Sequence, residues 1–177
     1  MENINRISVI GGSGTGKTTL TSNLGNKLNL PIYHIDGIHH LKNWEIRDKS
    51  ERDAIILDLI EKEKWIIDGT YRATLEKRLK KSDLVIFLDF SRFAQIRGVL
   101  KRYFTNPGKE KYEIPGCNEK LSLKFLLFVW NWRKQKRSFI LENLNKIDSK
   151  KVIIFKNRRQ LNKWFEKEFN SKIIRYN

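Results

Sequence analysis

The residues with the clearest chemistry form a glycine-rich run near the amino terminus that ends in a lysine and a threonine. The run matches the pattern G-x-x-x-x-G-K-[ST] at every specified position: Gly11, Gly12, Ser13, Gly14, Thr15, Gly16, Lys17 and Thr18. Glycines let the backbone curl so that successive N–H groups face a phosphate chain, which side chains would block. Lys17 is expected to contact the β- and γ-phosphates, and the Thr18 hydroxyl to ligate Mg²⁺. The run, continued by Thr19, therefore predicts a site for a nucleoside triphosphate such as ATP, bound with Mg²⁺.

Three aspartates, Asp36, Asp68 and Asp89, stand at the ends of short apolar runs. Parallel strands place their carboxyl ends at one edge of a sheet, where ligands bind, so we expect these carboxylates near the phosphate loop. Asp68 is predicted to hold the metal through water, and Asp36 to orient or deprotonate an acceptor hydroxyl. A single carboxylate in such a place serves equally well to cap a helix. The prediction therefore rests on the three together.

Phosphoryl transfer also requires cations at the transferring oxygens, and the second half of the chain supplies arginines for this. Arg97, Arg102, Arg133 and Arg137 stand where a closing lid would bring a guanidinium to the γ-phosphate. We predict catalytic roles for Arg133 and Arg137 and a nucleotide-binding role for Arg102. The aromatic cluster of residues 125–132 is read as core packing or a dimer contact, with base stacking as the alternative.

Short β-branched runs alternate with longer helical patterns, which is typical of an α/β protein with a doubly wound parallel sheet. Strands are expected at residues 4–10, 31–36, 65–68, 83–89 and 151–156. Helices are expected at residues 16–29, 50–64, 71–81, 93–104, 122–145 and 160–169, the second of them started by a capping box of Ser50 and Asp53. Residues 105–120 contain two prolines and two glycines without periodicity, which indicates a mobile loop or small lid.

Length and composition restrict the class of protein. The 177 residues suit one domain, with a lid or insert at about 105–137, and 40% hydrophobic residues are typical of a globular chain. The longest apolar run is too short for a membrane span, and the amino terminus lacks the apolar stretch of a signal peptide, so we expect a cytoplasmic protein without a membrane partner. Cys117 is the single cysteine, which excludes a disulfide within the chain. Either a monomer or a homodimer is compatible with these features.

The net charge of +16 is concentrated in the second half of the chain. Residues 92–137 alone contain 12 basic and 3 acidic side chains. Such an asymmetry favours phosphate-bearing ligands, including nucleic acid, although a solvated basic face explains it as well.

On the motifs just described, the sequence resembles the bacterial DNA topology modulation proteins, which belong to the adenylate-kinase-like branch of P-loop kinases. The resemblance rests on the residues of the loop 11–18, the segment 31–36 with Trp44 after it, the segment 65–71, the stretch 78–89 and the tryptophans before Arg133. It implies a three-layer α/β/α P-loop NTPase fold with a five-stranded parallel sheet in the order 2-3-1-4-5 and a small basic helical lid. It also implies an acceptor pocket at Asp36, Asp68, Gly69 and Arg72 and a nucleotide-base contact at Arg158. From the residues themselves, His39 or His40 and the loop residue Trp44 are further candidates for contacting the acceptor.

Two functions remain open at this point. The first is an ATP-dependent phosphotransferase acting on a small hydroxylated or phosphorylated acceptor such as a nucleoside or nucleotide. The second is a nucleic-acid-binding P-loop ATPase, or a nucleotide-gated protein, that modulates DNA topology. The intact loop with its strand-end acids favours the first, and the basic second half favours the second.

Overall fold

The computed structural model describes residues 4–174, which form a parallel sheet covered by helices on both faces. Five strands run in the order β2-β3-β1-β4-β7, so the predicted α/β fold and strand order are confirmed. The strands are β1 (Arg6–Gly11), β2 (Ile32–His34), β3 (Trp65–Asp68), β4 (Leu84–Leu88) and β7 (Val152–Phe155). All four pairings between them are parallel.

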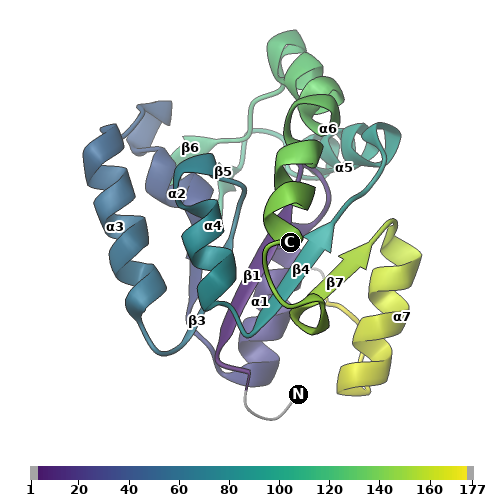
Figure 1. Cartoon of the computed structure of the whole chain (residues 1–177). Helices are drawn as coiled ribbons and strands as arrows, with labels where there is room; N and C mark the ends of the chain where they lie inside the picture. Colours follow the sequence, from purple (N-terminus) through teal and green to yellow (C-terminus); the bar gives the residue numbers. More distant parts are fainter. Residues whose placement is uncertain (1–3, 175–177) are drawn as a thin grey trace.

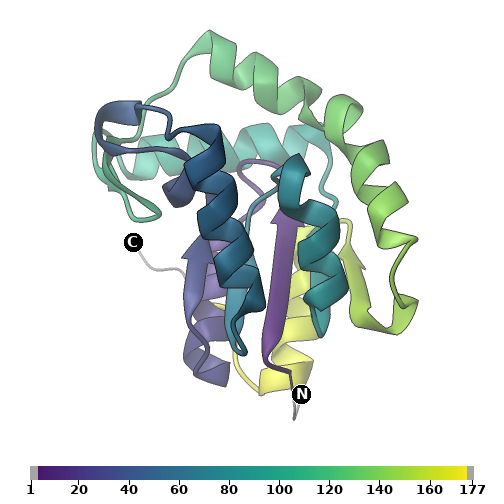
Figure 2. The ribbon, with the colours of Figure 1, turned by 60° about the vertical axis from the view of Figure 1, so that its left-hand side comes forward.

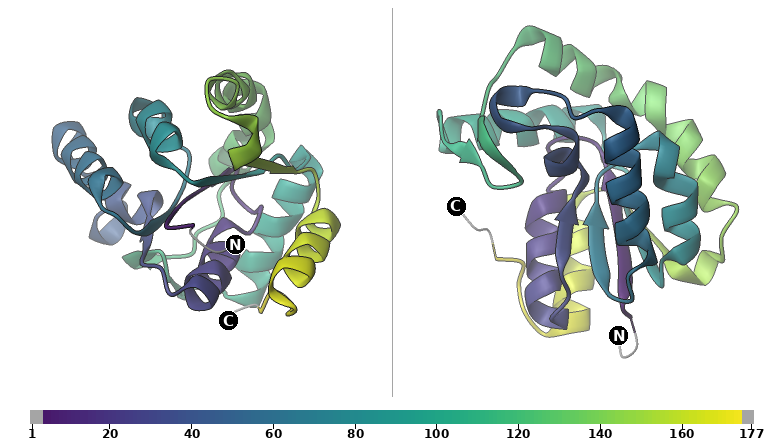
Figure 3. Two further views of the ribbon diagram at one scale, coloured as in Figure 1. Left: turned by 60° about the horizontal axis from the view of Figure 1, so that its bottom comes forward. Right: turned by 90° about the vertical axis from the view of Figure 1, so that its left-hand side faces the viewer.

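Helices form the two outer layers of the molecule (Figure 1). They are α1 (Lys17–Leu28), α2 (Ile35–His39), α3 (Lys49–Glu61), α4 (Arg72–Lys81), α5 (Arg92–Thr105), α6 (Leu123–Leu144) and α7 (Arg158–Phe169), with the 3₁₀ turns η1 (Lys42–Trp44) and η2 (Ser149–Lys151). Seen from below, α1 and α7 lie on one face of the sheet and α3, α4 and α6 on the other (Figure 3). Among residues 4–174, no helix combines the length and the apolar character that a membrane crossing requires.

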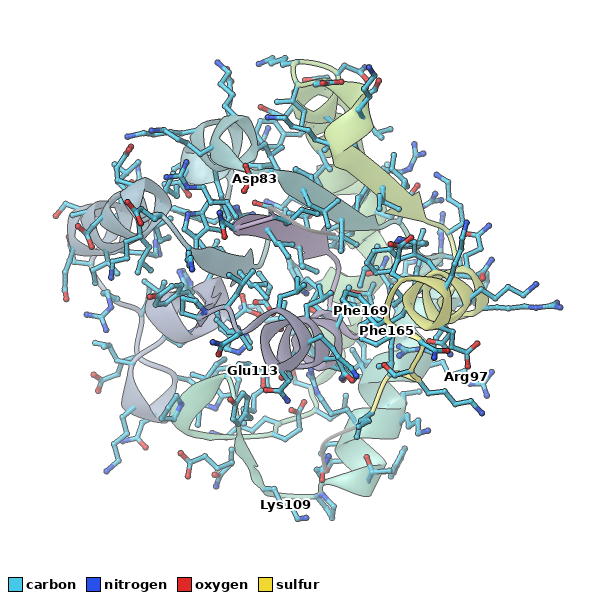
Figure 4. The ribbon with its side chains drawn as sticks, turned by 90° about the horizontal axis from the view of Figure 1, so that it is seen from below. Asp83, Arg97, Lys109, Glu113, Phe165 and Phe169 are labelled. Atoms are coloured by element: carbon cyan, nitrogen blue, oxygen red, sulfur yellow. The ribbon has the colours of Figure 1, made fainter. Side chains whose placement is uncertain are left out.

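The three central strands are buried on both faces, which explains their continuous apolar sequences. Ile7 and Val9 of β1 pack with Leu20 and Leu24 of α1 and with Phe165 of α7. Figure 4 shows Phe165 beside Phe169 on the inner side of α7. On the other face, α4 and α6 cover Ile10, Val85 and Phe87, and α3 covers Trp65 and Ile67. Sheet and helices therefore hold the carboxyl ends of β1, β3 and β4 at a fixed edge.

Three local expectations are wrong, and each has a physical reason. Residues 110–118 form a β-hairpin of β5 (Glu110–Lys111) and β6 (Ile114–Asn118) instead of an irregular loop. The strand expected to reach Asp36 ends at His34, because the chain turns into the short helix α2. The helix α3 is capped by Asp48, whose carboxylate accepts from the backbone N–H groups of Ser50 and Glu51, and not by Ser50.

The hairpin lies against the α2–η1 segment, although about 70 residues separate them in the sequence. Two views turned relative to each other show the hairpin beside this segment (Figures 2 and 3). Cys117 of β6 is 1% exposed; its Sγ accepts from the Trp44 N–H at 3.1 Å and donates to the Leu41 carbonyl at 3.2 Å. The hairpin is thus packed against the α2–η1 segment and covers the edge of the sheet at which the strands end.

Candidate active site

The phosphate loop connects β1 to α1 and packs against α5. Gly14 and Gly16 adopt left-handed backbone conformations with φ of 75° and 90°, which side chains disfavour. A Cβ on Gly14 would lie 2.2 Å from the Gln95 backbone carbonyl oxygen, so glycine is also needed for this contact with α5. The Thr15 hydroxyl and the Lys17 ammonium both donate to the Gly12 carbonyl, at 2.8 and 3.1 Å. The loop is therefore shaped by its own sequence and held by one neighbouring helix.

A cleft of about 1590 Å³ runs from this loop to α2 and the hairpin. Twelve of the site residues expected from the sequence line it: Ser13, Gly14, Gly16, Lys17, Thr18, Thr19, Asp36, His39, Trp44, Asp68, Arg102 and Arg158. Residues from six separate segments of the chain thus meet around one space. Most of the expected nucleotide residues and most of the expected acceptor residues therefore face the same cleft, whereas Gly11, Gly12 and the buried Thr15 of the loop do not line it.

Arg158 approaches the phosphate loop from the start of α7. Its guanidinium donates to the Thr15 carbonyl at 3.1 Å and lies 3.0 Å from the position that a Cβ on Gly16 would occupy. This contact fixes a positive charge at the end of the cleft that contains the loop. It arises because β7 ends beside β4 and directs the following helix toward the loop.

Asp68 ends β3 within a buried polar network. Its side chain is hydrogen-bonded to His34 Nδ1 at 3.0 Å and accepts from the Thr21 hydroxyl at 3.3 Å. Burial is the largest influence on His34 and opposes its charged form, but the hydrogen bond and the charge of Asp68, with Glu113 and Asp36, raise its pKa above 6.5. The Asp68 carboxylate therefore stabilises the charged form of the neighbouring imidazole, and its Oδ2 also faces α1.

A buried arginine supports the turn after Asp68. The Arg78 side chain has no exposed surface and donates from Nη2 to the Gly69 carbonyl at 2.7 Å. Burial lowers the pKa of Arg78 to about 10, and the charge of Asp68 opposes this shift. Gly69 itself packs against Ile35 and does not line the cleft. Gly69, expected to contact the acceptor, instead positions the residues around it.

Three arginines predicted for the site do not face the cleft. Arg133 and Arg137 of α6 bind the Asp89 carboxylate through Nε, each at 3.1 Å, and Lys156 Nζ binds it as well at 2.5 Å. Arg72 stacks over the Phe139 ring, 4.3 Å from its centroid. The side chain of Asp89 is fully buried, and burial, the largest influence, would raise its pKa, but the three cations lower it below its usual range. The strand-end position of Asp89 was recognised from the sequence, whereas its partners were not.

The hairpin supplies cleft residues that sequence reasoning missed, namely Lys111, Tyr112 and Glu113. Glu113 Oε1 accepts from the Thr18 hydroxyl at 3.4 Å and lies 4.0 Å from Arg102 Nη1. Figure 4 shows Glu113 close to α1 and Lys109 at the far end of the hairpin region, away from it. Gly37 permits this approach, because a Cβ there would lie 2.2 Å from the Glu113 carbonyl oxygen. A glycine next to the predicted acceptor aspartate was the one available signal.

The acceptor side of the cleft contains a second buried cation. Arg52 of α3, 7% exposed, donates to the Tyr71 hydroxyl at 2.7 Å and contacts His39 Nδ1. Tyr71 in turn donates to Asp53 at 2.7 Å. The contact with Arg52 fixes the ring of His39. Burial, together with the charges of His40 and Arg52, lowers the pKa of His39 below its usual value. His39 is therefore held as a neutral, oriented imidazole near pH 7.

The loop and the nearby oxygens fit a nucleoside triphosphate with Mg²⁺. The loop offers left-handed glycines, a lysine and a helix amino terminus, which together recognise phosphate oxygens. The hydroxyl of Thr18 and the carboxylate of Asp68 are hard oxygen ligands of the kind that Mg²⁺ prefers, with Asp68 suited to bind through water. Asp36, exposed to the cleft on α2, remains available to a second substrate.

Comparison with known proteins supports the fold assignment. No protein-family model and no curated protein sequence matches the chain. A shikimate kinase from Acinetobacter baumannii in complex with shikimate is 17% identical, with 98% of this chain and 97% of that chain covered and a TM-score of 0.61. A shikimate kinase from Bacteroides thetaiotaomicron (17%; 95% and 99% covered; TM-score 0.55) and a sugar kinase from a Janibacter species (17%; 93% and 93% covered; TM-score 0.52) are also similar. The chain therefore has the fold of P-loop kinases.

Proposed function

We propose that the protein is a kinase that transfers the γ-phosphoryl group of ATP to a hydroxyl of a small acceptor. The observation that carries this proposal is the single cleft in which the phosphate loop, Thr18, Asp68 and the exposed Asp36 meet. A motor or a switch protein needs no acceptor carboxylate beside its phosphate loop. A kinase needs one to orient the attacking hydroxyl.

The proposed reaction forms one bond, breaks one bond and transfers one proton. The acceptor oxygen forms a bond to the γ-phosphorus, and the bond from that phosphorus to the bridging oxygen of ADP breaks. The hydroxyl proton passes to the Asp36 carboxylate, which lies exposed to the cleft and returns it to solvent. Lys17 and Arg102 offer positive charge to the phosphoryl oxygens.

Thr18 and Asp68 would hold the magnesium ion, which neutralises phosphate charge and shapes the triphosphate when bound. The network around Asp68 serves this role, because Thr21 and His34 fix the carboxylate before any ligand arrives. Arg158 would flank the nucleotide at the opposite side of the loop. Burial of the Asp68 side chain also strengthens its electrostatic contact with a cation.

The test is nucleotide turnover by the purified protein with Mg²⁺, measured in parallel with nucleosides, nucleoside monophosphates, sugars, sugar acids and shikimate. We expect ADP release that depends on one acceptor class. Lys17→Ala is expected to abolish that release with an unchanged circular dichroism spectrum. Asp36→Asn is expected to lower kcat at least about 100-fold with ATP affinity retained, as for loss of a general base. Unchanged turnover in Lys17→Ala would eliminate the proposal.

Two similarities bear on the acceptor and on the family. The neighbours include enzymes named shikimate kinase and sugar kinase, which supports including sugars and cyclic hydroxy acids in the panel. The motif resemblance to DNA topology modulation proteins supports membership of that family, as a cytoplasmic enzyme. Within such a family a kinase alters DNA supercoiling indirectly, through the metabolite it makes.

A second candidate function is nucleic-acid binding by the basic second half, with ATP as a regulator. The observation that favours it is the cluster at Asp89, where three cations share one carboxylate and stay 33–51% exposed. Duplex DNA would then bind with an affinity that falls by about 0.9 log units per neutralised phosphate for each log unit of salt. Lys134→Gln on the exposed side of α6 should reduce that slope, and Lys49→Gln on α3 should not. Weak binding at low salt would reject this function.

A further inference from the structure

The acceptor end of the cleft contains a set of hydrogen-bond donors that the proposed reaction does not use. Lys111 of β5 lies with its ammonium 5.1 Å from the centroid of the Trp44 ring. Burial, the largest influence, lowers the pKa of Lys111, and the charge of Arg102 adds to this shift, whereas the charges of Glu113, Glu119 and Asp36 oppose it. Within residues 4–174, Lys111 forms no ion pair with a carboxylate. A half-buried ammonium with no directly paired carboxylate is stabilised by a ligand that supplies one at contact distance.

Two ring nitrogens beside Lys111 are also buried without a partner. Trp44 Nε1 and His40 Nδ1 have no hydrogen-bond partner in the described part of the chain, and their rings meet edge to face with centroids 5.3 Å apart. Buried polar atoms are nearly always satisfied in folded proteins, so an unsatisfied group calls for a ligand or water. An indole N–H and an ammonium can only donate. The missing group at this position is therefore an acceptor of hydrogen bonds.

The backbone that presents Trp44 is held in a costly conformation. Asn43 and Trp44 have φ of 61° and 66°, in the left-handed region that residues with side chains avoid. The hairpin holds this turn in place, because Cys117 Sγ accepts from the Trp44 N–H and Gly116 packs against Lys42. Strain of this kind is stored where the surrounding structure imposes it, and it gathers at ligand sites. The indole is thus oriented before the acceptor binds.

We propose that Lys111, Trp44 and His40 form a subsite for an anionic group of the acceptor, a carboxylate or a phosphate, while the reacting hydroxyl lies at Asp36. All four residues line the one cleft. An anion supplies the acceptor atoms that the Trp44 N–H and the Lys111 ammonium both lack. This inference rests on the proposed kinase function and narrows its substrate class to hydroxy compounds that carry a negative charge.

The subsite differs from the phosphate loop in position and in composition. Lys17 and the loop backbone serve the nucleotide phosphates, whereas Lys111 of β5 and Trp44 of η1 lie where the hairpin meets η1. Burial, the largest influence, lowers the pKa of His40, so its ring is neutral near pH 7. Nδ1 of the neutral ring donates or accepts a hydrogen bond according to the tautomer. Lys111 is therefore the cation of the subsite, whereas Arg52, which contacts His39, is already bonded to Tyr71.

The experiment compares related acceptors with and without an anionic group. Glucose, glucuronate and glucose 6-phosphate form one series, and adenosine with AMP a second. Phosphoryl transfer is measured for each, and binding of each acceptor without nucleotide is measured by calorimetry. We expect kcat/KM for an anionic member to exceed that of its neutral counterpart at least about tenfold, as for a charge-assisted hydrogen bond. Preference between the carboxylate and phosphate arms identifies the anion.

Variants connect this preference to the subsite. Lys111→Met is expected to raise KM and Kd for the anionic acceptor at least about tenfold with kcat nearly retained. Trp44→Phe keeps an aromatic ring but removes the N–H, and is expected to raise KM about threefold to tenfold. Lys124→Met removes the same charge from the exposed side of α6 and should leave both constants unchanged. Equal melting temperatures of these variants confirm that each is folded.

Several results would overturn the inference without touching the kinase proposal. One is Lys17-dependent transfer to neutral and anionic members with the same kcat/KM. Another is a fall in kcat for all acceptors in Lys111→Met, which would assign Lys111 to the transferred phosphoryl group instead. Absence of Lys17-dependent turnover with any acceptor would reject the kinase proposal, and the calorimetric arm would then still report whether Lys111 binds anions.

Discussion

The two ends of the cleft are built in different ways. The phosphate end consists of eight consecutive residues from the end of β1 to the start of α1, shaped by glycine backbone conformations and by hydrogen bonds within the loop. The acceptor end joins α2 and η1 to a hairpin about 70 residues later, through Cys117, Gly37 and Gly116. A site made of contiguous backbone is robust to changes elsewhere. A site assembled across the fold depends on every contact that holds its parts together.

The same contrast applies to the cations. Arg133, Arg137 and Lys156 surround the buried carboxylate of Asp89, so much of their charge serves the fold. Lys111 carries the same charge, is half-buried, and lies near an aromatic ring. Glu113, Glu119 and Asp36 act on its ammonium electrostatically, but among residues 4–174 none of them forms a direct ion pair with it. Partners, and not residue type, therefore separate a structural cation from one available to a ligand.

The largest expected effect concerns the phosphate end. Thr18→Val removes the hydroxyl that would ligate Mg²⁺ and that donates to Glu113 in the free protein. We expect kcat/KM to fall at least about 100-fold and the Mg²⁺ concentration needed for nucleotide binding to rise. Titration of Mn²⁺ by electron paramagnetic resonance measures the metal site directly. Thr18→Ser, which restores the hydroxyl, should recover most of both quantities.

A smaller effect is expected from separating the two halves of the acceptor end. Gly37→Ala places a methyl group 2.2 Å from the Glu113 carbonyl oxygen, so the hairpin must move. Alanine favours the α2 helix itself, and the conflict lies between α2 and the hairpin. The acceptor KM should rise at least about tenfold with ATP affinity within about twofold of wild type. Glu45→Ala, an exposed change in the same segment, serves as the control; equal effects of both variants would refute the docking of the hairpin as a requirement.

The Asp89 cluster is expected to affect stability. Asp89→Asn leaves three cations around a neutral group and should lower the free energy of unfolding by about 1–3 kcal/mol. The effect is smaller than for a fully buried ion pair, because water reaches the three partly exposed cations. Because the folded pKa of Asp89 is depressed, its stabilisation is present above the unfolded value of 3.8 and is lost as the pH falls through the folded value. Urea unfolding at pH 7 and near pH 3 measures both differences. Asp58→Asn, at an exposed carboxylate, should change little.

The smallest expected effect concerns Cys117. Cys117→Ala removes the bonds to Trp44 N–H and Leu41 carbonyl but leaves the rest of the hairpin contact in place. An acceptor KM about threefold higher corresponds to the loss of weak thiol hydrogen bonds. In the wild type, the 1% exposure of Cys117 predicts slow reaction with a thiol reagent, and Gly37→Ala should accelerate it. Fast labelling of the wild-type thiol would contradict a docked hairpin.

The sequence predictions were accurate for long, regular elements and inaccurate for short elements and single side-chain contacts. Helices and strands of the sheet were located to within a few residues, because buried parallel strands and amphipathic helices impose long, regular patterns. The capping of α3 by Asp48 and the short helix α2 were missed, since single side-chain bonds and a turn of five residues leave weak signals. The hairpin was missed because strands of two and five residues show no clear alternation.

The sequence by itself determined the phosphate loop, the order of the sheet strands and their long helices along the chain, and the acids Asp68 and Asp89 at strand ends, because each depends on neighbours in the chain. Only the tertiary structure decided which charges meet: it directs Arg133 and Arg137 to Asp89, and Lys111 and Glu113 into the cleft. Those pairings join residues about 40 to 95 positions apart. Side-chain type fixes what a residue can bind, and packing of the helices and the hairpin on the sheet fixes which partner it reaches.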